Sequence, residues 1–135
     1  MSLFQRGAFQ LHSGKDSWWK VECDALDWED WLTLAELAIE AFPHPIGKVV
    51  SVPRGGDLFA SALSQYSTRD ESDATVIVDD VLTSGGSLLE VMAQHPGSYG
   101  IVAFSRGFCP PRVLALWQLG NYPLTHRTFS PHNAS

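Results

Sequence analysis

The sequence predicts an α/β protein of three layers, with helices covering both faces of a mainly parallel sheet. Three short apolar runs rich in β-branched residues predict strands, at residues 48–52, 75–80 and 99–105. A segment with helical periodicity follows each of these runs. Apolar strands that alternate with helices are typical of a parallel sheet whose two faces are both buried.

The longest periodic segment, residues 27–42, predicts an amphipathic helix. Its apolar residues recur at helical spacing on one face, while acidic residues and a threonine occupy the other. Asp27 is suited to cap the start of this helix, and Pro43 and Pro45 end it. Shorter helical patterns are found at residues 57–66, 87–95 and 111–120.

At 135 residues the chain is expected to form a single domain. Residues 1–24 are expected to add a short segment of strand and helix, and residues 130–135 a frayed polar tail. Cys23 and Cys109 lack the spacing of metal ligands and are expected to be reduced thiols.

Net charge and hydropathy limit the kinds of molecule that this protein is expected to bind. The net charge of −6 argues against nucleic acid, because that affinity depends on Lys and Arg neutralising phosphates. The chain start lacks the apolar region of a signal peptide, and no apolar run approaches about 18 residues. We therefore expect a cytoplasmic protein that binds neither nucleic acid nor membrane.

Three loops rich in polar and small residues follow the predicted strands. In a parallel sheet the ligand site lies beyond the carboxyl ends of the strands. That rule brings the loops PRGG (53–56), DDVLTSGGS (79–87) and SRGFCPP (105–111) to one edge. The sequence therefore predicts a binding site at this edge.

The loop at 79–87 combines two acids with a small-residue turn. Gly85 and Gly86 let the backbone approach a ligand closely, and amides that lead into a helix start bind anions. Hydroxyl donors come from Thr83, Ser84 and Ser87. Asp79 and Asp80 suit the hydroxyls of a ribose, so the pattern predicts a site for a phosphorylated ribose. Mg²⁺ held mainly by ligand oxygens is compatible with it. The alternative is a capped turn in which the acids bond only backbone amides.

The stretch VIVDDVLTSGGS (76–87) resembles the phosphoribosyl-pyrophosphate (PRPP) signature of type I phosphoribosyltransferases. The resemblance implies their three-layer fold, Mg²⁺ bound with PRPP, and Asp79 and Asp80 as the catalytic acids. The implied PRPP-binding residues are Asp79, Asp80, Val81, Leu82, Thr83, Ser84, Gly85, Gly86 and Ser87.

The stretch VVSVPRGG (49–56) resembles the first loop of the same family. In the family this loop takes the pyrophosphate through backbone amides, often across a non-proline cis peptide bond. The implied pyrophosphate loop consists of Val52, Pro53, Arg54, Gly55 and Gly56. Arg54 adds a charge-assisted contact to that anion. The alternative is an ordinary turn.

The N-terminal stretch GAFQLHSGKDS (7–17) is similar to the opening of orotate phosphoribosyltransferases, which has the pattern F-x-L-x-S-G-K/R-x-S. The matching residues are Phe9, Leu11, Ser13, Gly14, Lys15 and Ser17. The resemblance implies a segment that lies over the site like a hood, with Phe9, Lys15 and Arg106 facing the acceptor base. Lys15 as a solvated surface residue is the alternative. Related enzymes form dimers, so a homodimer is also expected.

One part of the family pattern is missing. In these enzymes a long loop rich in Lys, Arg and His closes over PRPP and places positive charge on the departing pyrophosphate. The corresponding residues 64–74, SQYSTRDESDA, contain one cation, Arg69, and are too few to form a lid. Three hypotheses therefore stay open: Mg²⁺-dependent phosphoribosyl transfer to orotate or a similar base, a PRPP- or nucleotide-binding regulatory module without chemistry, and a structural subunit.

Overall fold

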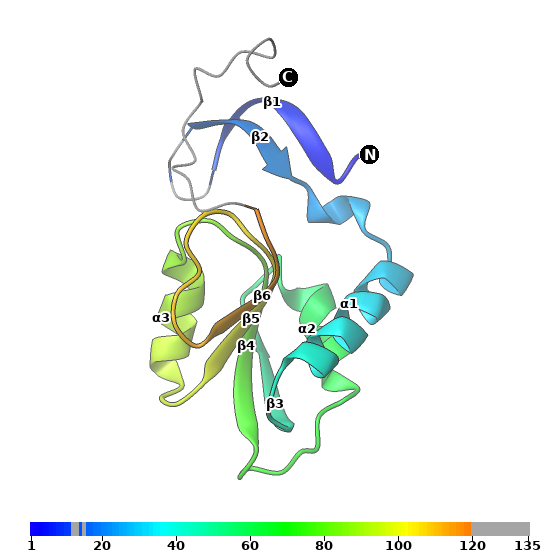
Figure 1. The fold of residues 1–135 in the computed structure, drawn as a ribbon, viewed down its shortest axis with the longest axis vertical. Coiled ribbons are helices and arrows are strands. Elements are labelled where there is room, and N and C mark those ends of the chain that lie inside the picture. Colours follow the sequence, from blue (N-terminus) through cyan, green and yellow to red (C-terminus); the bar gives the residue numbers. More distant parts are fainter. Residues whose placement is uncertain (12–13, 15, 120–135) are drawn as a thin grey trace.

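The computed structural model of the chain describes residues 1–11, 14 and 16–119. A two-stranded antiparallel sheet, β1–β2, stands beside a four-stranded parallel sheet of order β3-β4-β5-β6 (Figure 1). In chain order the elements are β1 (Phe4–Gln10), β2 (Asp16–Val21), the 3-10 helix η1 (Cys23–Ala25), α1 (Trp28–Ala41), β3 (Ile46–Ser51), α2 (Asp57–Ser64), β4 (Ala74–Leu82), α3 (Gly86–Gln94), β5 (Tyr99–Ser105) and β6 (Val113–Gln118).

Helices cover both faces of the four-stranded sheet, which confirms the predicted three-layer α/β/α class. Successive side chains of a strand point to opposite faces. Val76 and Val78 of β4 accordingly belong to the core shared with α1 and α2, whereas Ile77 packs with Leu88 of α3. The two central strands, β4 and β5, are therefore buried on both sides.

The longest helix forms as its pattern predicts. Asp27 accepts a hydrogen bond from the Asp30 amide, and Asp30 accepts one from the Asp27 amide, which makes a complete capping box. Trp31 and Ala35 are buried, and the Trp31 ring packs at a tilt against Phe59 of α2, with 5.4 Å between the ring centres. Trp28, predicted on the apolar face, is 41% exposed.

The prediction of a helix at residues 111–120 is wrong, because this segment forms β6. Its run of five apolar residues, Val113 to Trp117, is too short for periodicity to separate helix from strand. β6 pairs in parallel with β5, and Trp117 stacks on Phe104 of that strand at 5.6 Å. Pairing with the edge of the sheet therefore decides the conformation.

The N-terminal segment is mostly strand. β1 and β2 form a hairpin that lies beyond the carboxyl ends of β3–β6 (Figure 1). The helix expected within residues 1–24 is a single 3-10 turn, η1. The polar tail expected at 130–135 lies outside the described residues. Among the described residues, no helix is long and apolar enough to cross a membrane.

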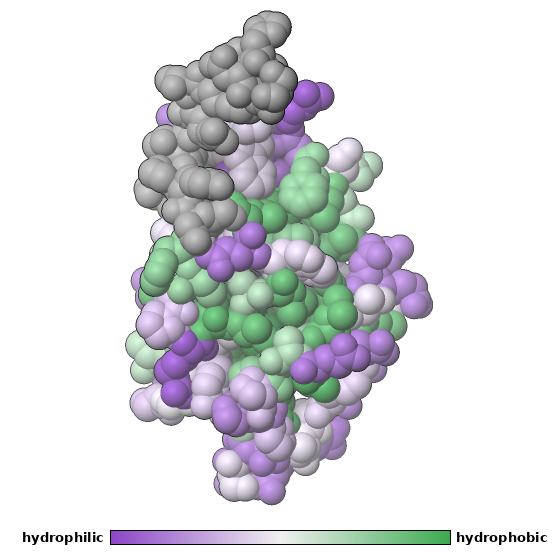
Figure 2. Space-filling view, viewed as in Figure 1, coloured by the Kyte–Doolittle hydropathy of each residue, from purple (hydrophilic) through white to green (hydrophobic). Residues whose placement is uncertain are grey.

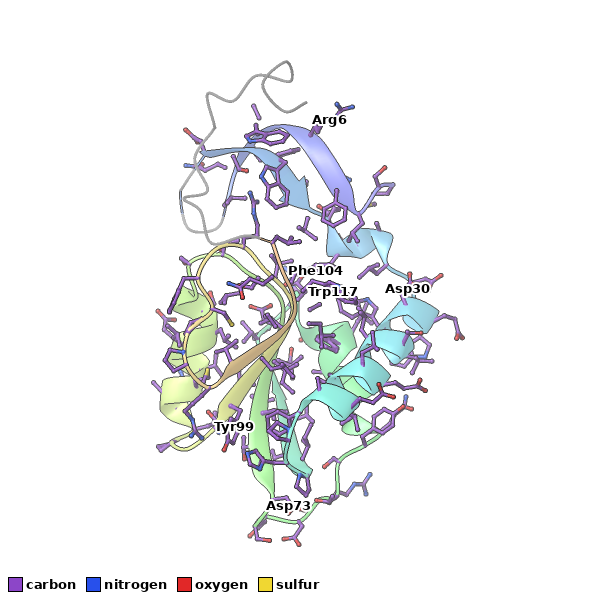
Figure 3. The ribbon with its side chains drawn as sticks, viewed as in Figure 1. Arg6, Asp30, Asp73, Tyr99, Phe104 and Trp117 are labelled. Atoms are coloured by element: carbon purple, nitrogen blue, oxygen red, sulfur yellow. The ribbon has the colours of Figure 1, made fainter. Side chains whose placement is uncertain are left out.

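The surface divides into an apolar middle and a polar end. Figure 2 shows apolar residues gathered across the middle of one face, where Phe104 and Trp117 are labelled in Figure 3. Trp117 is 43% exposed there. The end of the molecule farthest from the hairpin is polar and includes Asp73 (Figure 3).

The connection between α2 and β4, residues 65–73, lies at that polar end. The Thr68 amide donates to the Ile46 carbonyl, and the Ser67 hydroxyl donates to the Gly47 carbonyl. Ile46 and Gly47 begin β3, so these bonds attach the connection to the amino ends of the strands. The connection therefore runs along the opposite edge of the sheet from the three polar loops.

We expect Asp27→Ala to lower the free energy of unfolding by about 1 kcal/mol, because the amides at the start of α1 lose their acceptor. Urea denaturation followed by tryptophan fluorescence measures this change. Glu29→Ala is the matched control, since Glu29 is also an exposed first-turn acid but has no part in the capping box. Equal losses in the two variants would contradict the assigned role of Asp27.

Candidate active site

A cavity of ≈ 980 Å³ lies between the hairpin and the carboxyl edge of the parallel sheet. Its roof comes from β1, β2 and η1, and its floor comes from the loop after β3 and from residues 79–88. The predicted site residues that line it are Phe9, Val52, Pro53, Arg54, Gly55, Asp79, Asp80, Val81, Leu82, Thr83, Ser84, Gly85, Gly86, Ser87 and Arg106. The fold thus brings together residues that are up to 97 positions apart in the chain.

The first loop packs directly against the acid-bearing end of β4. A side-chain carbon at Gly55 would lie 2.7 Å from Asp80 Oδ1, and one at Gly56 would collide with the Val78 carbonyl oxygen. Glycine is therefore required at position 56, where the neighbouring atoms are backbone, whereas a side chain at position 55 would displace the Asp80 carboxylate. The peptide bond between Pro53 and Arg54 is cis.

Asp79 and Asp80 lie within β4, which continues to Leu82, two residues beyond the predicted strand. Asp79 Oδ1 accepts a hydrogen bond of 2.8 Å from the Asp80 amide, and Asp80 Oδ1 accepts one of 2.7 Å from the Val81 amide. These are the local bonds that the alternative interpretation of the two acids requires. Because both carboxylates also line the cavity, the local bonds orient groups that a ligand can reach.

The electrostatics of this pair favour a proton on Asp79. Burial is the largest of the effects that together raise the pKa of the Asp79 carboxyl to about 8. The side-chain hydrogen bond and the charge of Asp80 act in the same direction, and the hydrogen bond from the Asp80 amide opposes them. Neighbouring carboxylates in a poorly solvated site cannot both ionise easily. At neutral pH Asp79 therefore offers a hydrogen-bond donor as well as an acceptor.

The loop at 83–87 leads into the start of α3. Gly85, the residue before the helix, has φ 86°, a left-handed conformation that glycine adopts without steric cost. No side chain caps this helix start, where the first amides lack intrahelical acceptors; the nearest contact is a long one of 3.4 Å from the Gly86 amide to Ser84 Oγ. Residues 83–88 line the cavity, and free amides at a helix start suit an anion.

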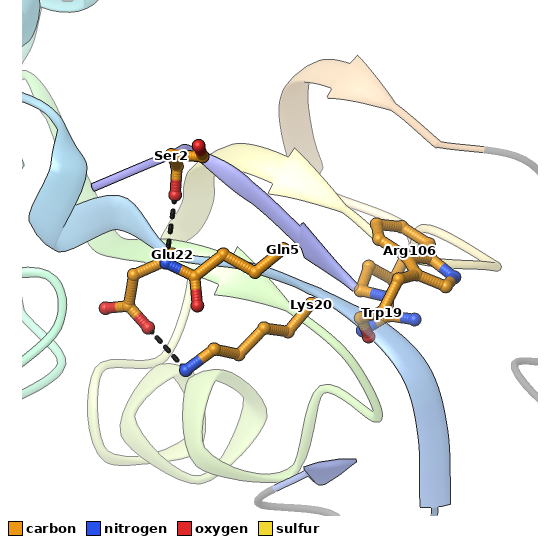
Figure 4. Close-up of polar contacts among 6 residues, drawn as sticks. All are labelled: Ser2, Gln5, Trp19, Lys20, Glu22 and Arg106. Atoms are coloured by element: carbon orange, nitrogen blue, oxygen red, sulfur yellow. Dashed lines mark hydrogen bonds and ion pairs between the residues drawn. The ribbon is translucent and has the colours of Figure 1, made fainter. Parts of the chain in front are cut away.

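Arg106 joins the hairpin to the sheet. Its guanidinium donates to the Trp19 carbonyl and to Ser17 Oγ at 3.1 and 2.8 Å. It lies 3.6 Å from the centre of the Trp19 ring, and Figure 4 shows these two side chains together. The side chain is 1% exposed, and burial lowers its pKa. No ion pair to Arg106 is present in the described part of the chain, and its Nε–H is buried without a partner.

Two predicted features fall outside the cavity lining. Gly56 lies beneath it, with its amide bonded to the Val52 carbonyl at 3.0 Å. Of the third loop only Arg106 lines the cavity, and Phe108 is 78% exposed on the surface. Lys15 lies outside the described residues.

Sequence reasoning missed most of the roof. Lys20 of β2 and Glu22, the residue that follows this strand, line the cavity and form an ion pair of 2.7 Å. Lys20 also lies 4.9 Å from the centre of the Phe9 ring. Cys23 and Trp31 add apolar lining. The alternation of Lys20 and Glu22 in WKVEC places them on one face of a strand, but only the position of the hairpin shows what that face covers.

The described side chains of the cavity do not form a metal site by themselves. Among the described residues, no group of three or more His, Cys, Asp or Glu side chains could hold a metal ion. Cys23 and Cys109 are both free thiols, as expected. Burial raises the pKa of the Cys23 thiol, with a further contribution from the Asp80 charge. A divalent cation at Asp79 and Asp80 would need oxygens from a bound ligand.

The architecture matches known structures. The chain aligns with orotate phosphoribosyltransferase from Aeropyrum pernix at a TM-score of 0.67 and 20% identity, over 87% of this chain and 88% of that one. The chain has the fold of a phosphoribosyltransferase. Orotate phosphoribosyltransferase from Mycobacterium tuberculosis H37Rv, in complex with inorganic phosphate, aligns at a TM-score of 0.59 and 18% identity. This alignment covers 84% of this chain and 87% of that one. Orotate phosphoribosyltransferase from Francisella tularensis aligns at a TM-score of 0.57 and 15% identity, over 86% of this chain and 80% of that one.

Neither a protein-family model nor a curated protein sequence matches the chain. The structural likeness therefore confirms the predicted phosphoribosyltransferase fold, while activity and substrate are argued from the residues of the cavity.

We expect Gly56→Ala to destabilise the protein by about 1–3 kcal/mol, because its side chain would enter the backbone of β4. Gly86→Ala is the control, since the nearest atom to its added carbon is Ser84 Oγ at 3.7 Å. Denaturant unfolding of both variants makes the comparison. Retained stability in Gly56→Ala would show that the first loop does not press on β4 as described.

The proton on Asp79 predicts a pH dependence of stability. The folded state holds this proton more tightly than the unfolded chain, whose aspartate pKa is near the ordinary value of 3.8. The resulting stabilisation is complete below pH 3.8 and is lost as the pH rises through about 8. The slope contributed by one group is at most about 1.4 kcal/mol per pH unit.

Asp79→Asn should therefore flatten the fall in unfolding free energy between about pH 5 and 8, measured by urea titration at several pH values. Glu71→Gln, which removes an exposed acid of the 65–73 connection, should leave the fall unchanged. An unaltered slope in Asp79→Asn would mean that this carboxyl is ionised in the folded protein.

Proposed function

We propose that this protein binds PRPP or a nucleoside monophosphate and, with Mg²⁺, transfers a phosphoribosyl group to a small base. The arrangement that supports this most strongly is the cavity floor. There, two adjacent carboxylates lie between the uncapped start of α3 and the first loop. A phosphorylated ribose with a second anionic group is complementary to this floor. Its phosphate suits the amides at the start of α3, its hydroxyls suit the two acids, and its second anionic group suits the first loop.

Each part of the floor has a role in the proposal. The amides and hydroxyls of residues 83–87 hold the 5-phosphate, and Asp79 and Asp80 bond the ribose hydroxyls. Residues 52–55 take the pyrophosphate. During transfer a bond forms between the base nitrogen and C1′ of the ribose, the bond from C1′ to the pyrophosphate oxygen breaks, and its electron pair leaves with the pyrophosphate. The proton of the base nitrogen passes to solvent water.

The acceptor end of the cavity is defined by Arg106 and Phe9. Arg106 bonds only neutral groups of β2, so its buried charge is not compensated by a carboxylate in the described residues. An anionic or carbonyl-rich base would supply that compensation. Phe9 offers a ring for stacking. These features favour an orotate-like acceptor, with Lys15 proposed as a further contact.

Mg²⁺ fits the site as a partner of the ligand. Among the described residues, five acids line the cavity, Glu22, Asp24, Asp79, Asp80 and Glu90, against the cations Lys20, Arg54 and Arg106. Even with a proton on Asp79, the acids outnumber the cations. A pyrophosphate brought into this surplus of negative charge needs its own counter-ion. Mg²⁺ bound to its oxygens supplies that charge and makes pyrophosphate a better leaving group.

A second function, PRPP or nucleotide binding without transfer, has one observation in its favour. The 65–73 connection is bonded to the amino ends of the strands and does not reach the cavity. A site without a cationic lid loses preorganised stabilisation of the leaving group, on the order of 3 kcal/mol or a hundredfold in rate. Binding does not depend on that stabilisation.

Calorimetry with PRPP and Mg²⁺ tests the shared part of both functions. We expect binding by the wild type and at least about tenfold weaker binding by the Asp79→Asn, Asp80→Asn double variant, which lacks both carboxylates. Glu71→Gln serves as the control. Equal affinity in the double variant would place the ligand elsewhere.

Release of pyrophosphate in the presence of orotate and a panel of other bases then separates the two functions. Turnover that requires Mg²⁺ and a base supports transfer. PRPP binding with no turnover across the panel would rule out transfer in favour of the binding module.

A further inference from the structure

Ser17, which matches the N-terminal pattern, has no part in the proposed function. It lies on β2, is buried and does not line the cavity. Its hydroxyl donates to the Trp19 carbonyl at 2.5 Å, and it accepts from the Trp19 amide at 3.2 Å and from Arg106 Nη2 at 2.8 Å. A serine hydroxyl has one donor and two acceptor positions, so each of them is in use.

These bonds form a closed network around the Arg106 guanidinium. Nη2 donates to Ser17 Oγ and Nη1 donates to the Trp19 carbonyl, and these two acceptors are bonded to each other. The guanidinium carbon lies 3.6 Å from the centre of the Trp19 ring. The hairpin therefore holds the guanidinium by two of its nitrogens and by its flat face, and a buried network of this kind restricts rotation of the side chain.

The orientation of Arg106 matters because little of the side chain can be reached. Arg106 lines the cavity but is only 1% exposed. The network uses two of the five N–H donors of the guanidinium, and the Nε–H is buried without a partner. A small rotation of the side chain therefore decides which of the remaining donors a ligand in the cavity can reach.

Burial of a serine does not by itself produce such a network. Ser105 precedes Arg106 in the chain and is completely buried, yet its hydroxyl has no hydrogen-bond partner in the described structure. The two serines are therefore alike in burial and differ in whether they bond the guanidinium.

We propose that Ser17 is a positioning residue for acceptor recognition. Its hydroxyl holds the Arg106 guanidinium in the orientation in which Arg106 contacts a carboxylate of the acceptor base. This inference rests on the proposed function, and within it on the acceptor end of the cavity.

Three ligands separate the acceptor end from the floor: ribose 5-phosphate, uridine 5′-monophosphate and orotidine 5′-monophosphate. The two nucleotides differ by one carboxylate on the base. We expect the wild type to bind the carboxylate-bearing nucleotide about tenfold more tightly than the other, because Arg106 bonds that group. The ratio of these two affinities, measured by calorimetry, is the readout of the Arg106 orientation.

Ser17→Ala removes the hydroxyl and should lower this ratio about fivefold or more, since a charge-assisted hydrogen bond weakens as its distance and angle change. Ribose 5-phosphate affinity should stay within about twofold, because residues 79–87 hold that ligand at a distant part of the site. Ser17→Thr keeps the hydroxyl and suits a strand, so the ratio should stay within about threefold of the wild-type ratio.

Ser105→Ala is the matched control, because it removes a buried hydroxyl that bonds nothing in the described structure and should change none of the three affinities. Arg106→Lys keeps the charge and removes the fork of donors. If Ser17 acts through Arg106, adding Ser17→Ala to Arg106→Lys should lower the ratio no further.

Each outcome decides a different claim. An unchanged ratio in Ser17→Ala, or a further loss when it is added to Arg106→Lys, would overturn the role of Ser17 while the proposed function stands. A loss of ribose 5-phosphate in the same proportion would mean that Ser17 supports the whole hairpin and not acceptor recognition. A wild type that binds ribose 5-phosphate without any preference between the nucleotides also overturns this inference alone. A wild type that binds none of the three ligands overturns the proposed function, and this inference with it.

Discussion

The cavity exists because one buried guanidinium connects two sheets. Arg106, which follows β5 at its carboxyl end, bonds the Trp19 carbonyl and Ser17 Oγ of β2 and lies 3.6 Å from the centre of the Trp19 ring. Its own amide donates to the Leu82 carbonyl, at the end of the strand that carries the two acids. A buried charge is costly unless its donors are satisfied, so the hairpin and the sheet are held in one relative position by a residue that also lines the space between them.

Most of the helices and strands could be predicted from local sequence pattern, and the element that was predicted wrongly, β6, depends on a tertiary contact. The capping residues of α1 and the apolar runs of β3, β4 and β5 identify those elements without tertiary information. Residues 113–118 do not, because a short apolar run fits a helix or an edge strand equally well, and pairing with β5 decides between them. The conformation of β6 is set by a partner strand, which no local pattern contains.

The floor of the candidate site was predictable because its residues are adjacent in sequence, and the strand-edge rule brings its loops together. The roof was not. Lys20 and Glu22 look like an ordinary solvated pair until the hairpin is placed over the sheet by Arg106. Gly56 shows the reverse: a residue inside a recognisable loop is used for backbone packing beneath the cavity. Position in a motif therefore does not by itself decide which atoms a ligand can reach.

The described strands of the hairpin share no backbone ladder with the four-stranded sheet (Figure 1). An isolated pair of strands is only marginally stable in water, whereas β4 and β5 are buried at the centre of the domain. We therefore expect amide hydrogen exchange in two populations, with the amides of β1 and β2 exchanging faster than those of the central strands. Because the hairpin forms the roof of the cavity, a local opening that breaks the Arg106 contacts would expose the floor to solvent.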